Sequence, residues 1–171
     1  MFKEITPLKL TENVFEIVGK KWMLITAGNQ NSFNTMTASW GGFGNLWNVP
    51  VVFIFIRPQR YTYQFIEREN FFTLSFFEKK YHHMLSYCGS HSGETVDKIK
   101  ETGLLPFETK LGNITFEQAR LVLECQKIYF EDIHPENFID RLIHRNYPKK
   151  DYHRMYIGKI VNVYSKEISE S

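Results

Sequence analysis

The chain of 171 residues has little cysteine, almost no excess of either charge and no long hydrophobic run. Its two cysteines, Cys88 and Cys125, cannot build a disulfide framework, and no CxxC pair is present for zinc or redox chemistry. We expect both to be buried as small apolar residues. Lys and Arg total 21 against 19 Asp and Glu, so the net charge of +2 predicts no nucleic-acid partner. The longest apolar run, 51–56, is far below the roughly 20 residues that span a bilayer, which predicts no membrane partner.

The N-terminal segment also lacks the apolar stretch that is typical of a secretory signal. Together with the low cysteine content, this predicts a protein of the reducing cytoplasm. Ten glycines and six prolines are too few for a collagen-like or low-complexity chain. Aromatic residues, in contrast, make up 16% of the sequence, which excludes a disordered chain. No repeat, linker or change in composition divides the sequence, so we expect one domain over residues 1–171.

Six segments carry strand signals, because they are short, apolar or alternating, and several are bounded by turn residues. These segments are 22–27, 33–40, 51–56, 71–77, 121–130 and 155–164. The first two are separated by the turn-rich stretch GNQNS and are expected to form a hairpin. The segment 51–56 (VVFIFI) is β-branched and aromatic throughout, which predicts a central strand buried on both faces.

Three helices are predicted between or after these strands. The segment 63–69 follows Thr62 as a candidate N-cap, and 94–102 is followed by Gly103 as a stop. The segment 135–144 has a proline in its first turn and one apolar face. That face consists of Phe138, Ile139, Leu142 and Ile143. The pattern as a whole predicts a mainly β fold, an antiparallel barrel with short flanking helices, and not a parallel sheet.

Several catalytic motifs are missing. The run GGFG at 41–44 does not continue into a dinucleotide-binding fingerprint, because Trp47 stands where the third glycine is needed. The run GSHSG at 89–93 has His91, not serine, at its centre. No HExxH or Walker A sequence occurs, and the adjacent His82 and His83 face apart, so no metal site is expected. Because no nucleophile with its base is evident, we name no catalytic side chain and expect a cofactor to carry any chemistry.

Three segments nevertheless point to a ligand. The first, 34–40 (NTMTASW), is a strand of small hydroxyl residues that would let a flat ligand approach the backbone. An exposed strand face with threonine chosen for its β propensity is the alternative interpretation. The second, 57–62 (RPQRYT), places Arg57 and Arg60 between a strand and a helix, a position suited to phosphate. A solvated arginine-rich loop is the alternative there.

The third segment, 89–98 (GSHSGETVDK), leads from a glycine-bounded loop into a predicted helix. Lys98 lies within that helix and could reach back to an anion. The alternative is a capped surface helix with Thr95 or Ser92 as the cap.

The order of these pieces carries a family resemblance. NTMTASW, then RPQRYT, then SHSGETVDK, then a late YIGKIV strand resembles the flavin reductase-like, FMN-binding split-barrel family, and within it the flavoredoxin type. The resemblance runs from about residue 22 to residue 163, and NTMTASW is its most specific part. It implies a split β-barrel and a homodimer that holds FMN in a surface groove near the subunit interface.

The resemblance also implies which residues contact FMN. The isoalloxazine would lie along the first segment, the phosphate and ribityl chain along the second, and the loop before Lys98 would close on the cofactor. The implied cofactor-binding residues are Asn34, Met36, Thr37, Ala38, Ser39, Trp40, Arg57, Arg60, Tyr61, Thr62, Ser90, His91, Ser92 and Lys98. Glu94 and Thr95 depart from the family pattern, which leaves the nicotinamide or partner side of the pocket open.

The resulting hypothesis is an FMN-dependent oxidoreductase. It would move electrons from a reduced donor such as NAD(P)H, through bound FMN, to a small-molecule or protein acceptor. Two alternatives stay open: an FMN-dependent electron carrier without turnover, and a binding module of the same fold that has no cofactor.

Overall fold

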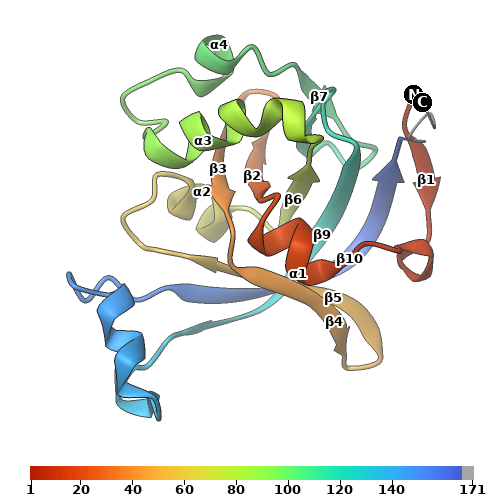
Figure 1. Cartoon of the computed structure of the whole chain (residues 1–171). Coiled ribbons are helices and arrows are strands. Elements are labelled where there is room, and N and C mark those ends of the chain that lie inside the picture. The colour runs from red at the N-terminus through yellow and green to blue at the C-terminus, as the bar shows by residue number, and fades with distance from the viewer. Residues whose placement is uncertain (167–171) are drawn as a thin grey trace.

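The computed structural model describes residues 1–166 and shows a curled antiparallel sheet with short helices on its outside (Figure 1). The strands are β1 (Lys3–Ile5), β2 (Met23–Asn29), β3 (Ser32–Ala38), β4 (Gly41–Leu46), β5 (Val49–Ile56), β6 (Phe71–Phe76), β7 (Pro106–Glu108), β8 (Ile114–Phe116), β9 (Leu121–Asp132) and β10 (Arg154–Ser165). The α-helices are α1 (Val14–Gly19), α2 (Thr62–Arg68), α3 (His82–Ser90) and α4 (Lys98–Thr102). Short 3₁₀ turns cover Pro7–Lys9, Lys79–Tyr81, Pro135–Asn137 and Arg141–Asn146.

The main sheet has the strand order β3-β2-β6-β9-β10-β5-β4, with β1 paired to β10 and with all neighbours antiparallel. A separate pair, β7 and β8, lies beside β6. The long strands β9 and β10 change register twice, after Ile157 and after Ile160, and such bulges bend a sheet toward closure. The mainly β, antiparallel barrel with short flanking helices is confirmed.

All six predicted strands are present, and the first two form the predicted hairpin. Strand β5 is central, because β10 pairs with one edge and β4 with the other. Its inner side chains Val52, Ile54 and Ile56 are fully buried, whereas Phe53 and Phe55 on the other face are half-buried. Val51 on that outer face is fully buried, so the prediction that both faces are buried is wrong only for Phe53 and Phe55.

Two groups of apolar side chains stabilise the barrel. Alternate residues of the main strands, such as Ile25, Leu74 and Leu123, fill the interior. A second group, which includes Leu85 and Phe116, lies between the sheet and the outer elements α3 and β8. Cys125 belongs to the first group and Cys88 to the second, and both are free and buried, as predicted.

The predicted helix starts need correction. Helix α2 begins at Thr62 itself, and the Thr62 hydroxyl accepts a hydrogen bond from Asn34 instead of capping the helix. The helix expected over 94–102 begins only at Lys98, because the Asp97 side chain accepts hydrogen bonds from the amides of residues 99 and 100 and caps it there. Its end at Gly103, with φ +68°, is as predicted.

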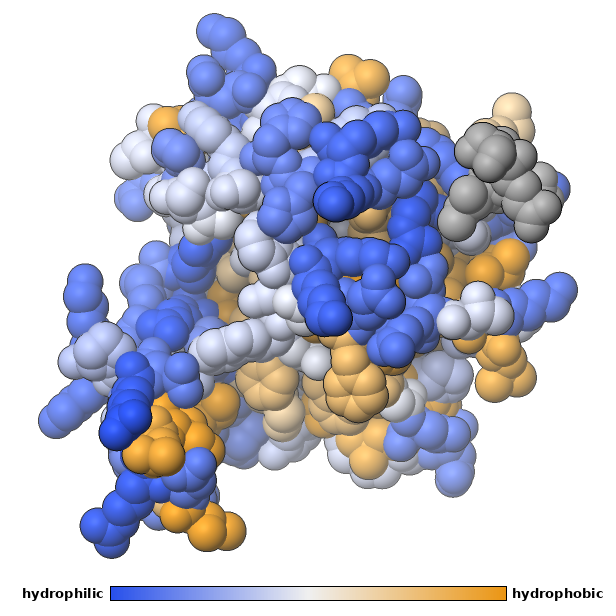
Figure 2. All heavy atoms as spheres, in the orientation of Figure 1, coloured by the Kyte–Doolittle hydropathy of each residue, from blue (hydrophilic) through white to orange (hydrophobic). Residues whose placement is uncertain are grey.

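The helix predicted over 135–144 is wrong. That part of the chain belongs to an arm, residues 133–153, which projects from the barrel and contains two separate 3₁₀ turns (Figure 1). Ile139 is 99% exposed and Leu142 57% exposed, and hydrophobic atoms are visible at the arm in Figure 2. An amphipathic helix is stabilised mainly by burying its apolar face, and the arm offers no such surface.

Two helices, α1 and α3, were not predicted. Helix α3 (HHMLSYCGS) has few apolar residues in its pattern, and it is held by packing Leu85 and Cys88 against the outside of the barrel. Among residues 1–166, no helix is long and apolar enough to cross a bilayer.

Candidate functional site

The three segments that sequence analysis singled out converge on one region of the barrel surface. Every one of the fourteen predicted residues lines at least one of three cavities, of about 180, 150 and 520 Å³. Arg60 lines both the first and the second cavity, and Tyr61 and Lys98 line both the second and the third. The cavities therefore form a continuous site, although the fourteen predicted residues lie between positions 34 and 98 of the sequence and other lining residues reach position 153.

The first cavity runs along the end of β3, where the small side chains leave the strand open. Its predicted lining residues are Met36, Thr37, Ala38, Ser39, Trp40, Arg57 and Arg60. The Thr37 hydroxyl donates to the carbonyl of Leu85 at 2.5 Å, which fixes α3 against this strand. Asn34, further back on β3, donates to Thr62 at 2.7 Å and so joins the strand to α2.

Arg57 and Arg60 both come after the end of β5, but their guanidinium groups have different hydrogen-bond partners. Arg57 Nη1 donates to Asp151 Oδ2 at 2.5 Å, and this guanidinium holds the pKa of Asp151 below its ordinary value. Arg60 Nη1 donates to the carbonyl of Gly89 at 2.8 Å, and burial lowers the pKa of Arg60. Arg60 thus lies between the first two cavities, while Arg57 ties the arm to the barrel.

Lys98 is the most enclosed cation of the site, with 4% of its surface exposed. Its ammonium donates to the carbonyls of Thr35 at 2.8 Å and Cys88 at 2.9 Å, and burial lowers its pKa to about 8. An ammonium group has three N–H donors, so one remains for an anion in the adjoining cavity.

The loop after α3 closes the second cavity. Ser90 is the last residue of α3, and it lines that cavity together with the loop residues His91 and Ser92 and with Thr62 and Lys98. The His91 ring stacks on Tyr87 with centroids 3.9 Å apart, and the Ser92 hydroxyl accepts from the amide of Glu94.

Gly93, the next residue of this loop, approaches β3 very closely. A Cβ atom at this position would lie 2.0 Å from Asn34 Oδ1, so any other residue here would have to displace the Asn34 side chain or the loop.

Sequence analysis missed two residues that line the first cavity, Phe55 and His153. His153 is 8% exposed, its ring lies 5.1 Å from that of Trp40, and its Nδ1 lies 2.9 Å from the Tyr147 hydroxyl. Burial lowers the pKa of His153 to about 4, so its imidazole is neutral at pH 7. No local sequence pattern points to His153 as a site residue. It directly precedes β10, and only the antiparallel pairing of β10 with β5 brings it beside Arg57.

Comparison with known protein families identifies the domain. A family model described as "Flavin reductase like domain" matches residues 17–171. The chain belongs to this family. A comparison with curated protein sequences gives no match.

Solved structures share the fold of this flavin reductase like domain. A flavoredoxin from Methanosarcina acetivorans is 24% identical with a TM-score of 0.67, and the match covers 95% of this chain and 77% of that one. An FMN-binding protein from Thermus thermophilus is 19% identical with a TM-score of 0.68, covering 96% and 82%. An NADH:FAD oxidoreductase from Streptomyces globisporus is 17% identical with a TM-score of 0.64, covering 85% and 74%.

The chemistry of the described site suits a ligand with a flat, polar ring and an anionic tail. The ring side has exposed strand backbone and small hydroxyl side chains, while the tail side has Arg60 and Lys98. Within residues 1–166, no group of three or more His, Cys, Asp or Glu side chains is placed to hold a metal ion.

Proposed function

We propose that this flavin reductase like domain binds FMN in the three adjoining cavities and works as an FMN-dependent oxidoreductase. It moves electrons from a reduced donor, such as NAD(P)H, to a small-molecule or protein acceptor. The observation that supports this most is the convergence of β3, Arg60, the 89–93 loop and Lys98 on one continuous hollow surface.

The residues fit FMN in chemistry and in order. Thr37 and Ser39 lie where the ring would rest, and the backbone of β3 offers donors and acceptors to its polar edge. Arg60 and Lys98 bring positive charge to the second cavity, where the dianionic phosphate would lie. Bound FMN would supply the redox chemistry, and the chain would position it and shield it from water.

His153 has a separate role in this proposal. Neutral and oriented by Tyr147, it presents a polar ring edge at the first cavity beside Trp40. It thus offers a hydrogen-bonding group to whatever lies over the flavin ring without adding charge there.

A second candidate function is an electron carrier without turnover. It is favoured by the similarity to flavoredoxins from two organisms, Methanosarcina acetivorans and Desulfovibrio vulgaris. The two functions share the cofactor and differ only in whether NAD(P)H is oxidised.

One experiment tests the cofactor and then the activity. The purified chain, after incubation with FMN and removal of free cofactor, is expected to show flavin absorbance bands at about one FMN per chain. NADH and NADPH oxidation by this holoprotein, well above that of free FMN, would support the enzyme, whereas reversible reduction without turnover would support the carrier. A colourless protein that takes up no FMN would overturn both and leave a binding module.

The position of the flavin ring is tested at Thr37. We expect Thr37→Leu to block FMN uptake, because the larger side chain fills the first cavity. Thr37→Val is the matched control, since it keeps the size of threonine and removes only the hydroxyl that binds the Leu85 carbonyl. FMN content and circular dichroism are measured for both variants. Normal FMN content in folded Thr37→Leu would place the ring elsewhere.

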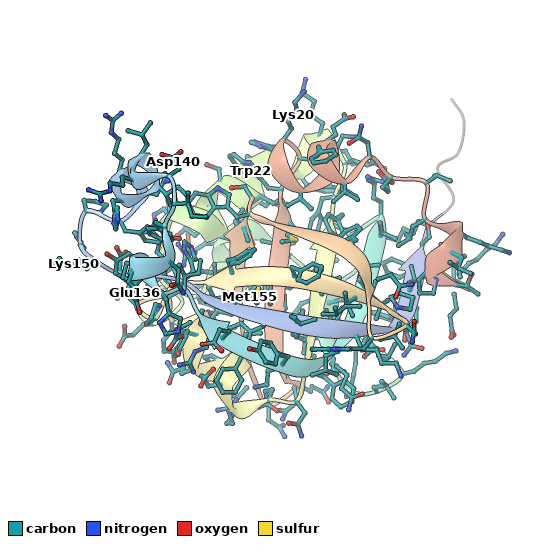
Figure 3. All side chains as sticks on the ribbon, turned by 90° about the horizontal axis from the view of Figure 1, so that it is seen from below. Lys20, Trp22, Glu136, Asp140, Lys150 and Met155 are labelled. Atoms are coloured by element: carbon teal, nitrogen blue, oxygen red, sulfur yellow. The ribbon has the colours of Figure 1, made fainter. Side chains whose placement is uncertain are left out.

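We propose in addition that the protein is a cytoplasmic homodimer. The sheet formed by β5, β10 and β9 faces the viewer in Figure 3 with no helix over it, and Met155 lies on this part of the sheet. Trp47 and Tyr129 are 59% and 40% exposed and lie against each other with ring centroids 6.1 Å apart. An exposed apolar surface of this kind is typical of an interface, and it adjoins the first cavity through Phe55.

A further inference from the structure

A fourth cavity, of about 390 Å³, lies between α1 and α3, away from the proposed flavin site. Its apolar wall consists of Phe77 and Leu85, which are buried, and of the His82 ring. Lys20, Lys21 and Lys79 stand around its opening. This volume lies within the range of about 300–1,000 Å³ that is usual for small-molecule sites.

The aromatic side of this cavity is supported by a residue in an unusual backbone conformation. Trp22 has φ +65°, in the left-handed region that bulky side chains rarely adopt. This conformation brings the indole against the His82 ring, with centroids 4.1 Å apart. Figure 3 shows Trp22 next to the end of α1 and Lys20 extending outward from it. The His82 ring is thereby fixed as a flat wall.

The charges around the opening are not balanced. Glu16 lies 3.2 Å from Lys21, and Glu78 lies 2.8 Å from Lys80, so both acidic side chains of the cavity already have a cationic partner. Over the part of the chain that the structure describes, Lys20 and Lys79 form no ion pair. The opening therefore has two ammonium groups that can attract an anion from solvent.

We propose that this cavity binds a small aromatic carboxylate. The flat apolar part of such a ligand would lie against His82, Phe77 and Leu85, and its carboxylate would lie between Lys20 and Lys79. A neutral aromatic compound would lose the charged contacts, and an inorganic anion would lose the apolar contact.

This site is independent of the flavin site, although the two share one element. Leu85 presents its side chain to the fourth cavity, while its carbonyl accepts the hydrogen bond from Thr37 beside the first cavity. The proposal does not depend on FMN binding, and it can be tested with or without the cofactor.

The test uses 2-naphthoate as the probe, with 2-naphthamide as its neutral counterpart, in titration calorimetry of the full chain. We expect one 2-naphthoate per chain, with the same affinity in the presence and absence of saturating FMN, and at least tenfold weaker binding of 2-naphthamide. The double variant Lys20→Glu/Lys79→Glu should weaken 2-naphthoate binding at least tenfold. The control Lys9→Glu/Lys100→Glu changes the net charge equally, at exposed positions outside this cavity, and should change affinity less than twofold.

Three results would overturn the proposal: no measurable binding at millimolar 2-naphthoate, displacement of the probe by FMN, or equal losses in the two double variants. His82→Ala provides a further measurement, because it removes the flat wall and leaves the lysines in place. Unchanged affinity in this variant, with the fold intact by circular dichroism, would also contradict the proposed pose.

Discussion

Lys98 has its ammonium buried against the carbonyls of Thr35 and Cys88, and its pKa is lowered to about 8. Burial disfavours the charged form, whereas an anion beside it would favour that form. The same side chain lies at the junction of the second and third cavities. A lysine in this position can hold a phosphate group strongly, but only while it is protonated.

We therefore predict that FMN affinity falls as the pH rises above about 8. The phosphate is already dianionic from about pH 7 upward, so its charge does not change in this range. Lys98→Met should weaken FMN binding roughly 10- to 100-fold at pH 7, as expected for a lost hydrogen bond to a charged group of about 1.5–3 kcal/mol. It should also remove the decrease above pH 8. Fluorescence titrations between pH 6.5 and 9.5 measure both effects, and a pH dependence that persists in Lys98→Met would contradict the assignment.

Glu124 is also a buried charged residue, but unlike Lys98 it has a structural role. It is fully buried on β9 and accepts hydrogen bonds from Asn113 at 2.7 Å, Asn162 at 2.6 Å and Tyr164 at 3.0 Å, and a further one from Thr109. Burial and this carboxylate raise the pKa of Tyr164 to about 12. Because its donors come from the β7–β8 loop and from β10, Glu124 joins the small sheet to the barrel.

At the scale of elements, the loop between α3 and α4 is held to β3 by close contact and not by a long apolar surface. Gly93 permits this contact, because a Cβ atom on residue 93 would lie only 2.0 Å from Asn34 Oδ1. Any side chain at position 93 must push the loop, or Asn34, away from the site.

We predict that Gly93→Ala lowers FMN affinity at least tenfold while the barrel stays folded. Gly42→Ala is the control, because a Cβ at Gly42 in β4 would meet no atom within 4 Å. Equilibrium titration with FMN and thermal unfolding are measured for both. If Gly93→Ala binds FMN as tightly as Gly42→Ala, the loop does not contribute to the cofactor site.

The arm, residues 133–153, is attached at its base by polar contacts. Arg57 and Gln59 of the barrel donate to Asp151, and within the arm His153 forms a hydrogen bond with Tyr147. The arginine also lies over the Tyr147 ring, 5.2 Å from its centroid. Protonation of the buried His153 would place a second positive charge near Arg57, so this attachment is most stable while His153 is neutral.

We predict that acid weakens the folded state through His153. The pKa of His153 is about 4 in the folded chain, below its ordinary value of 6.5, so the unfolded chain takes up a proton first as the pH falls. The stabilisation is complete above pH 6.5 and decreases toward pH 4, with a loss of about 2 kcal/mol between pH 7.5 and 5. The free energy of unfolding is measured by urea titration between pH 7.5 and 5, for the wild type and for His153→Gln. The difference in unfolding free energy between the two should shrink over this range, and a constant difference would exclude His153 as the cause.

At the scale of the whole molecule, some of the exposed apolar side chains lie on the uncovered face of the β5, β10 and β9 sheet and on the arm. Trp47 and Tyr129 lie on that face, and Ile139 lies on the arm. The proposed dimer would cover such residues, and its interface would adjoin the first cavity.

Light scattering after size exclusion should give twice the mass of the chain. Trp47→Asp/Tyr129→Asp should shift the protein toward the monomer, because two charges would be buried in the interface. Leu8→Asp/Phe15→Asp is the control, since these side chains are more exposed, at 91% and 90%, but lie elsewhere. A monomeric wild type, or dissociation by the control pair, would contradict this interface.

The sequence by itself determined most of the main sheet and much of the composition of the site. Alternation and β-branched runs located six of the ten strands that the structure describes, because these patterns depend on nearby residues only, but β1, β4, β7 and β8 were not predicted. The order of NTMTASW, RPQRYT and the 89–98 segment indicated the family and fourteen of the residues that line the three cavities, but not Phe55 or His153.

Only the tertiary structure decided where polar side chains and helix ends lie. Thr62 binds Asn34 instead of capping a helix, His153 reaches the site through the pairing of β5 with β10, and Lys98 is buried under β3. The apolar pattern of 135–144 forms no helix on the arm, because no surface of the barrel covers it. A strand can be predicted from the sequence because its pattern involves side chains only a few residues apart. The burial of a side chain, its pKa and the formation of a helix in a segment of low helix propensity depend on contacts between residues far apart in the chain.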